Sequence, residues 1–239
     1  MSDAIASHPL IETEMLEYLR QYDTPTICNA LDIAMPEKSR LTGFTRTQFV
    51  ALDSDLPPIV GYARTAMIRS TSPFCPAEKR AKALEYYEYT SNGVGPTIVV
   101  VQDIDANPGL GAHWGEVHTA LHQKLGSVGA ITNGSFRDID DSARGFQDLG
   151  GSINPSHAYV HVVDYGGEVE IFGMNVKHGD LLHADKHGAA VIPFEAVHKL
   201  PAAIKTIAAR EKVILDAIKD PDFDIEMLKQ AVGKSAEIH

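Results

Sequence analysis

The segment from Trp114 to Asp138 constrains the fold more than any other part of the chain. It begins with Trp114-Gly-Glu-Val-His118, ends with Gly134-Ser-Phe-Arg-Asp138, and carries an amphipathic stretch, a glycine and an apolar run in between. The amphipathic stretch predicts a helix that stops at Gly126, and residues 128–132 predict a strand. A helix and a return strand bring a chain back to the same sheet edge. We therefore expect the two ends of this segment to be neighbours in space.

Helical and strand patterns alternate along the rest of the chain. The spacing of apolar residues predicts further strands at 60–70, 97–102, 158–164, 169–172, 180–184 and 189–192, with a hairpin turn at Gly166-Gly167. It predicts helices at 11–22, 24–33, 77–90, 141–149 and 195–219, and a last short helix capped by Asp224. Without a break in composition, this alternation favours one α/β domain over residues 1–239.

Composition limits the class of protein. The chain has 239 residues, of which 44% are hydrophobic and 22% charged, as is usual for a soluble globular protein. No apolar run approaches the length of a membrane span, and the amino terminus lacks the features of a signal peptide. Cys28 and Cys75 are expected to be reduced thiols of a cytoplasmic protein. The net charge of -11 argues against binding to nucleic acid or to an anionic membrane.

Three further motifs accompany the central segment. Thr24-Pro-Thr-Ile-Cys-Asn-Ala-Leu31 begins a helix, Ile59-Val-Gly-Tyr-Ala-Arg-Thr65 lies in a strand, and residues 176–193 hold a Gly-Asp turn and a second aspartate before Gly188 and Pro193. In this order and spacing, over roughly residues 16–193, the chain resembles the RraA-like family. That family includes metal-dependent 4-hydroxy-4-methyl-2-oxoglutarate aldolases and the RraA inhibitors of ribonuclease E.

The resemblance implies a fold and an assembly. The expected fold is α/β, a β/β/α layered sandwich of the swivelling-domain type with amino- and carboxy-terminal helices, in which residues 16–193 form the core and residues 194–239 a helical extension. Family members form trimers or hexamers, so a homotrimer or homohexamer with the site at a subunit boundary is expected. A neighbouring chain is then expected to supply an acid, for which Glu195, Asp222 and Asp224 are candidates.

The residue types in the central segment suit the cleavage of a 2-oxo acid that carries a hydroxyl two carbons from its keto group. Breaking its carbon–carbon bond leaves a pyruvate enolate, which a divalent cation and an arginine both stabilise. Asp138 offers a hard oxygen ligand for Mg²⁺ or Mn²⁺, Arg137 is the candidate partner of the enolate, and Gly115 allows close approach of the backbone. The resemblance to the aldolases implies substrate contacts at Gly115, Glu116, Val117, His118 and Arg137, and metal binding at Asp138. Glu116 falls where the aldolases have an aspartate that holds a metal-bound water, so it is a candidate catalytic residue with Arg137.

Several of these residues have structural alternatives. An Arg-Asp pair is more often a solvated surface pair. His118 and His122 have the spacing of a zinc site, with His113 nearby, but packed or solvated histidines are the commoner outcome. The tyrosines at 86–89 suit packing or an oligomer contact, or else the entrance of a pocket.

The predicted function is that of a divalent-metal-dependent lyase, an aldolase of the class II type. It is expected to cleave a 4-hydroxy-2-oxo di- or tricarboxylate to pyruvate through a metal-bound enolate, with oxaloacetate decarboxylation as a possible side activity. One alternative is a non-catalytic RraA-type regulator that docks on a ribonuclease, since an acidic protein suits a basic partner. Another is an enzyme of the same fold with a different substrate.

Overall fold

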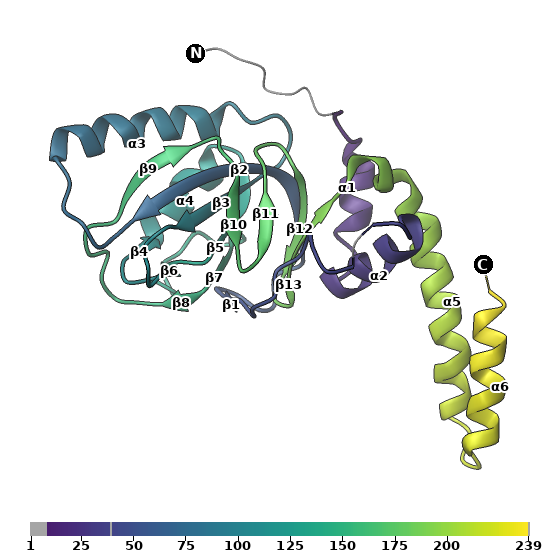
Figure 1. Cartoon of the computed structure of the whole chain (residues 1–239). Coiled ribbons are helices and arrows are strands. Elements are labelled where there is room, and N and C mark those ends of the chain that lie inside the picture. The colour runs from purple at the N-terminus through teal and green to yellow at the C-terminus, as the bar shows by residue number, and fades with distance from the viewer. Residues whose placement is uncertain (1–8, 39, 239) are drawn as a thin grey trace. The chain divides into compact units, whose positions relative to one another are not determined.

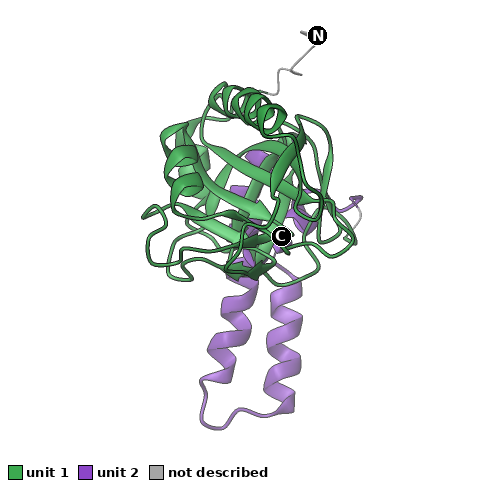
Figure 2. Cartoon of the chain, turned by 90° about the vertical axis from the view of Figure 1, so that its left-hand side faces the viewer, with its two compact units in different colours: residues 1–24, 39–194 green, residues 25–38, 195–239 purple. Residues whose placement is uncertain are grey.

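The computed structural model of the protein describes residues 9–38 and 40–238, which divide into two compact units (Figure 2). Unit 1 comprises residues 1–24 and 39–194, and unit 2 comprises residues 25–38 and 195–239. The prediction that the amino terminus is not a signal peptide concerns residues 1–8, which lie outside the described residues. Among the helices of the described residues, none has the length and apolar character needed to cross a membrane. The expectation of one domain over the whole chain stays a prediction.

Unit 1 contains the sheets of the protein and the helices α1, Thr13–Leu19, α3, Pro76–Ser91, and α4, Glu116–Lys124 (Figure 1). Its largest sheet has the strand order β1-β7-β5-β3-β2-β12-β13, with β9 also paired to β2. The strands of this sheet are β1 (Val50–Ala51), β2 (Ile59–Arg69), β3 (Thr97–Asp103), β5 (Ser127–Thr132), β7 (Gln147–Gly150), β9 (His161–Tyr165), β12 (Leu181–Asp185) and β13 (Gly188–Ile192).

Strand β2 is long enough to organise both halves of this sheet. Its first residues pair with β12 and its last residues pair with β9, both antiparallel, while β3 runs parallel along its other edge. Strands β3, β5 and β7 continue the parallel run. Such parallel strands are buried on both faces, which explains the unbroken apolar run Ile98-Val-Val-Val101 in β3, all fully buried.

Each face of the large sheet has its own apolar core. One core includes Ile98 and Val100 of β3 and the apolar residues of a hairpin formed by β10, Val169–Ile171, and β11, Met174–Val176. The other core includes Val99 of β3, Tyr86 of α3, and the large side chains Trp114, Phe136 and Phe146. This second core supports the region in which the central sequence segment lies.

A small parallel sheet brings the two ends of that segment together. It has the order β4-β6-β8, with β4 at Ala112–Trp114, β6 at Ser135–Phe136 and β8 at Ser152–Ile153. Because β4 and β6 are parallel neighbours, Gly115 and Arg137 follow them at the same edge, and the Arg137 amide donates to the Trp114 carbonyl oxygen at 3.1 Å. The expected proximity is confirmed. It arises from these two short strands, which the sequence pattern did not predict, and not from β5.

Two local expectations are wrong. Residues 141–149 do not form a helix, since the chain turns at Gly145, which has a φ of 79°, and continues as β7 between β1 and β5. Sheet pairing there outweighs the helical spacing of the apolar residues. Gly166-Gly167 does not join a hairpin either, because β9 pairs with β2, and β10 pairs instead with β11.

Unit 2 contains helix α2 (Thr24–Ala34), the 3-10 helix η1 (Phe194–Lys199) and a pair of longer helices. The first residue of α2 and the first residue of η1 belong to unit 1. Helix α5, Leu200–Ile218, begins with Pro201 in its first turn, and α6, Ile225–Ala236, runs back beside it (Figure 2). The Asp224 carboxylate caps α6 by accepting from the Met227 amide at 2.8 Å, as expected from its position.

Candidate active site

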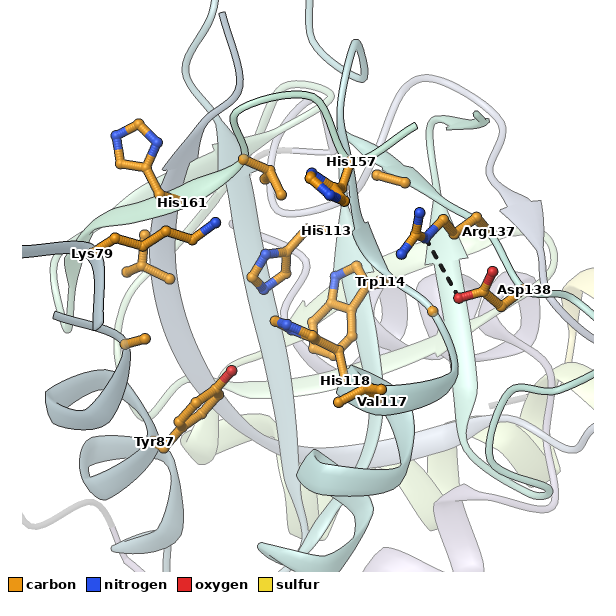
Figure 3. A pocket seen from close by; sticks show the side chains of 15 residues that line it. Lys79, Tyr87, His113, Trp114, Val117, His118, Arg137, Asp138, His157 and His161 are labelled. Carbon is orange, nitrogen blue, oxygen red and sulfur yellow. Dashed lines mark ion pairs between the residues drawn. The ribbon is translucent and has the colours of Figure 1, made fainter. Parts of the chain in front are cut away.

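A cavity of about 230 Å³ opens in unit 1 beside the small sheet (Figure 3). Residues from α3, β4, the start of α4, the loop after β6 and the segment around β9 line it. These residues are Lys79, Ala83, Tyr87, Ala112, His113, Trp114, Gly115, Val117, His118, Arg137, Asp138, His157, Val160, His161 and Val162. The Arg137-Asp138 pair therefore lies on the wall of a cavity, where a small ligand can reach it.

Gly115 is required by close packing. Its φ of 175° is extended backbone that any residue can adopt. However, a Cβ on Gly115 would lie 2.5 Å from the Asp138 Oδ2 atom and 3.3 Å from the Arg137 side chain. The missing side chain thus makes room for the Asp138 carboxylate directly in front of the first turn of α4.

Gly115→Ala is expected to displace Asp138 while the fold survives, since the added methyl meets a partly exposed side chain. Turnover should fall at least about tenfold, as expected when a catalytic group shifts by about an ångström. Steady-state assays with Mg²⁺ and a thermal melt check this. Gly126→Ala has open space around it but a φ of 95°, so it should lower stability and leave activity unchanged. Normal turnover in Gly115→Ala contradicts the assignment.

The Asp138 carboxylate is held in place from several sides. Its Oδ2 atom lies 3.4 Å from the Arg137 Nε atom and accepts from the Glu116 amide at 3.3 Å. Asp138 has a φ of 53°, in the left-handed region that aspartate tolerates better than most residues. Its carbonyl oxygen accepts from the Ser142 amide at 2.9 Å and from the Ser142 hydroxyl at 2.8 Å. The loop thus fixes where the carboxylate points.

The donor set fits a hard divalent cation with one protein ligand. Within residues 9–38 and 40–238, no donor contacts the Asp138 Oδ1 atom, so this oxygen is available to a cation. The same described residues contain no group of three His, Cys, Asp or Glu side chains placed to hold a metal. Mg²⁺ accepts such a site, because it keeps several waters and takes one or two carboxylates.

Arg137 is anchored and still accessible. Its Nη1 atom donates to the Pro155 carbonyl oxygen at 3.4 Å, and its side chain is about one-third exposed. Figure 3 shows the guanidinium pointing into the cavity and away from the loop backbone. Because the fork has five donors, several remain for a ligand.

The structure places most of the predicted site residues on the cavity wall. Gly115, Val117, His118, Arg137 and Asp138 line it. Glu116 differs, because its side chain is exposed and is not part of the wall, while its backbone amide contacts Asp138. The substrate, catalytic and metal roles of these residues remain predictions.

A cluster of imidazole rings lies at the cavity, where His113 and His118 line it and His122 packs against His118. Burial, reinforced by Lys79 and Arg137, lowers the pKa of His118 to about 4, and burial lowers the pKa of His122 to about 3. Burial also lowers the pKa of His113 well below its usual value. All three rings are therefore neutral at pH 7.

His122 is fully engaged by protein groups. Its Nδ1 atom donates to the His118 carbonyl oxygen at 2.7 Å, so its Nε2 atom accepts from the Tyr86 hydroxyl at 2.8 Å. Neither ring nitrogen is left for a metal. This geometry favours the packed alternative for the His118 and His122 pair over a zinc site.

Comparison with known proteins places the chain in a family. Residues 24–191 match the family described as RraA-like, Aldolase/RraA. The chain belongs to the RraA-like family. This family contains both aldolases and non-catalytic RraA inhibitors of ribonucleases. The chain matches no protein with a curated description.

Solved structures share the RraA-like fold with this chain. An uncharacterized protein from Pseudomonas syringae pv. tomato is 19% identical, covers 98% of this chain and 99% of its own, and has a TM-score of 0.71. Streptomyces coelicolor RraAS2, an unusual member of the RNase ES inhibitor RraA family, is 19% identical over 89% of this chain and 100% of its own, with a TM-score of 0.64. The predicted α/β layered fold with helices at both ends is confirmed.

Sequence reasoning missed part of this RraA-like site. Lys79 of α3, His157 before β9 and His161 at the start of β9 come from segments that carry no local catalytic pattern. Among the tyrosines at 86–89, Tyr87 does line the cavity, whereas Tyr86 is fully buried in the core. The cluster of tyrosines at 86–89 was the sequence signal that this helix reaches the cavity. That signal did not extend to Lys79, which lies about two helical turns earlier.

Proposed function

We propose that the chain is a divalent-metal-dependent lyase that cleaves a 4-hydroxy-2-oxo di- or tricarboxylate to pyruvate and a second carbonyl compound. The observation that carries the proposal is the meeting of three groups on one cavity wall. These groups are the first turn of α4, the Arg137 guanidinium and the Asp138 carboxylate. Together they offer amides for a carboxylate, a fixed cation for an oxyanion and an oxygen ligand for a metal.

The first turn of α4 is suited to bind the carboxylate of the 2-oxo acid. The amides at the start of a helix lack partners within the helix and point outward with a partial positive charge. Gly115 gives no side chain to block them. Arg137, which follows the neighbouring strand β6, is proposed to donate to the keto oxygen, on which negative charge grows as the bond breaks.

Asp138 would hold the metal, whose chemistry when bound is to polarise the keto and carboxylate oxygens of the substrate. In the cleavage, a base removes the proton of the 4-hydroxyl group, and the bond between C3 and C4 breaks. Its electron pair forms the enolate of pyruvate, which then takes a proton at C3. Glu116, next to the start of α4, is the proposed holder of the water that moves these protons. Oxaloacetate passes through the same enolate, so its decarboxylation is a proposed side activity.

The second candidate is a regulator that docks on a ribonuclease. Its support is the likeness in fold to Streptomyces coelicolor RraAS2 and the net charge of -11, which suits a basic partner. The side chains of Arg137 and Asp138, which lie together on the wall of an accessible cavity, favour the enzyme.

Release of pyruvate from a panel of 4-hydroxy-2-oxo acids separates these candidates. We expect turnover that requires Mg²⁺ or Mn²⁺ and stops when EDTA is added. If no acid in the panel releases pyruvate with either Mg²⁺ or Mn²⁺, the proposal of a lyase is wrong.

We also propose that the chain forms a closed homotrimer with the site near a subunit boundary. Its support is exposed apolar surface on α5, α6 and the turn between them, which an isolated chain leaves in water. The residues are Leu215, Ile218, Phe223, Ile225 and Val232, each between 36% and 62% exposed. Light scattering should report three times the mass of 25.9 kDa, or six times for a hexamer. A stable monomer at micromolar concentration contradicts this prediction.

A further inference from the structure

Two cations face each other across the cavity. Figure 3 shows the Lys79 ammonium and the Arg137 guanidinium pointing toward one another from opposite sides, with His113 between them. Both line the same cavity, and both bear electrostatically on His118. Arg137 already contacts Asp138, so the unmatched charge is that of Lys79.

Lys79 is held at the cavity by an aromatic ring. Its Nζ atom lies 4.2 Å from the centre of the Phe74 ring, in cation–π contact. Among the described residues, no carboxylate pairs with Lys79, whereas Lys82, one turn further along α3, pairs with Glu85 at 3.1 Å. A preplaced cation without a counter-ion is suited to bind an anionic ligand.

The His113 ring, which lies on the wall between the two cations, is polar but uncharged, because burial lowers its pKa well below the usual value. His113 is 94% buried, since its exposed fraction is 6%, and its Nε2 atom has no hydrogen-bond partner. Within the described residues, Asp138 is the one carboxylate that lines the cavity. The cavity therefore carries a net positive charge in a protein of net charge -11, and a metal at Asp138 would increase that charge.

We propose that Lys79 binds the distal carboxylate of the substrate and thereby selects 2-oxo dicarboxylates over 2-oxo monocarboxylates. This inference rests on the proposed function, because it takes the 2-oxo acid end of the substrate to lie at Arg137. Lys79 is thus a specificity-determining residue supplied by α3.

Matched pairs of 2-oxo acids test the proposal by binding alone. 2-Oxoglutarate and 2-oxopentanoate have five carbons and differ in having a carboxylate or a methyl group at C5, and 2-oxoadipate and 2-oxohexanoate form the six-carbon pair. None carries a 4-hydroxyl group, so none is a substrate for the proposed cleavage. Their Kd values are measured by calorimetry with Mg²⁺ present for the wild type, Lys79→Met, Lys79→Arg and Lys82→Met.

For at least one chain length, the wild type should bind the dicarboxylate roughly tenfold more tightly than the monocarboxylate, as a hydrogen bond to a charged group allows. Lys79→Met keeps the apolar stem over Phe74 and should lose this preference without weakening the monocarboxylate. Lys79→Arg should keep the preference, and Lys82→Met should resemble the wild type.

The outcomes separate the inference from the function on which it rests. If the wild type binds 2-oxo acids but prefers neither partner of a pair, or if Lys79→Met keeps the preference, the role of Lys79 is wrong and the proposed function stands. If the wild type binds none of the four acids, both are wrong.

Discussion

Replacing Asp138 with alanine is expected to abolish metal-dependent turnover. Asp138 is the one carboxylate on the described cavity wall, and its Oδ1 atom is available to a cation. Without the Asp138 carboxylate, this part of the wall offers a divalent ion no anionic ligand, because Arg137 and the amides of the first turn of α4 are themselves positively polarised. Calorimetry with Mg²⁺ should show loss of binding, and pyruvate release should fall at least about a hundredfold, as when a group that stabilises developing charge is removed.

Two controls isolate the role of the carboxylate. Because Asp138 has a φ of 53°, alanine there is strained, whereas asparagine adopts this conformation readily. Asp138→Asn should therefore melt like the wild type and still lose most Mg²⁺ binding. Asp140→Ala removes an exposed acid that is not on the wall of this cavity and should be silent. Wild-type activity of Asp138→Asn at low Mg²⁺ overturns the assignment.

Arg137→Lys is expected to lower kcat by roughly two orders of magnitude, in line with the loss of one preorganised donor to an oxyanion. Lysine keeps the charge but lacks the planar fork that both reaches the Pro155 carbonyl oxygen and donates to a ligand. KM for the 2-oxo acid should change less, since the enolate carries more charge on its oxygen than the resting substrate does. Steady-state kinetics with a 4-hydroxy-2-oxo acid measure both constants.

Arg144→Lys is the matched control for this change. Arg144 is an exposed residue of the same loop, and its side chain does not line the cavity. The control should retain wild-type kcat. An equal effect of the two substitutions, or a change in Arg137→Lys confined to KM, contradicts a role at the enolate.

The sequence alone predicted the main elements and their order. The helix near 77–90, the strand at 97–102 and the pair of α4 and β5 lie close to their expected positions, because each has a strong apolar period of its own. The prediction for residues 141–149 is wrong, because the spacing of their apolar residues fits a helix, whereas pairing with β5 and β1 makes the end of this region a strand. Strands β4 and β6 have two or three residues each, too few to show any period.

The sequence by itself determined the family, the α/β class and the pair Arg137-Asp138, because these are local patterns in a fixed order. Only the tertiary structure decided what surrounds that pair. Lys79 reaches the cavity because α3 packs its Tyr86 into the core beside Trp114, and Asp138 fits because Gly115 on the neighbouring strand end has no side chain. Contacts between residues far apart in sequence depend on sheet pairing and side-chain packing, which a single sequence does not display.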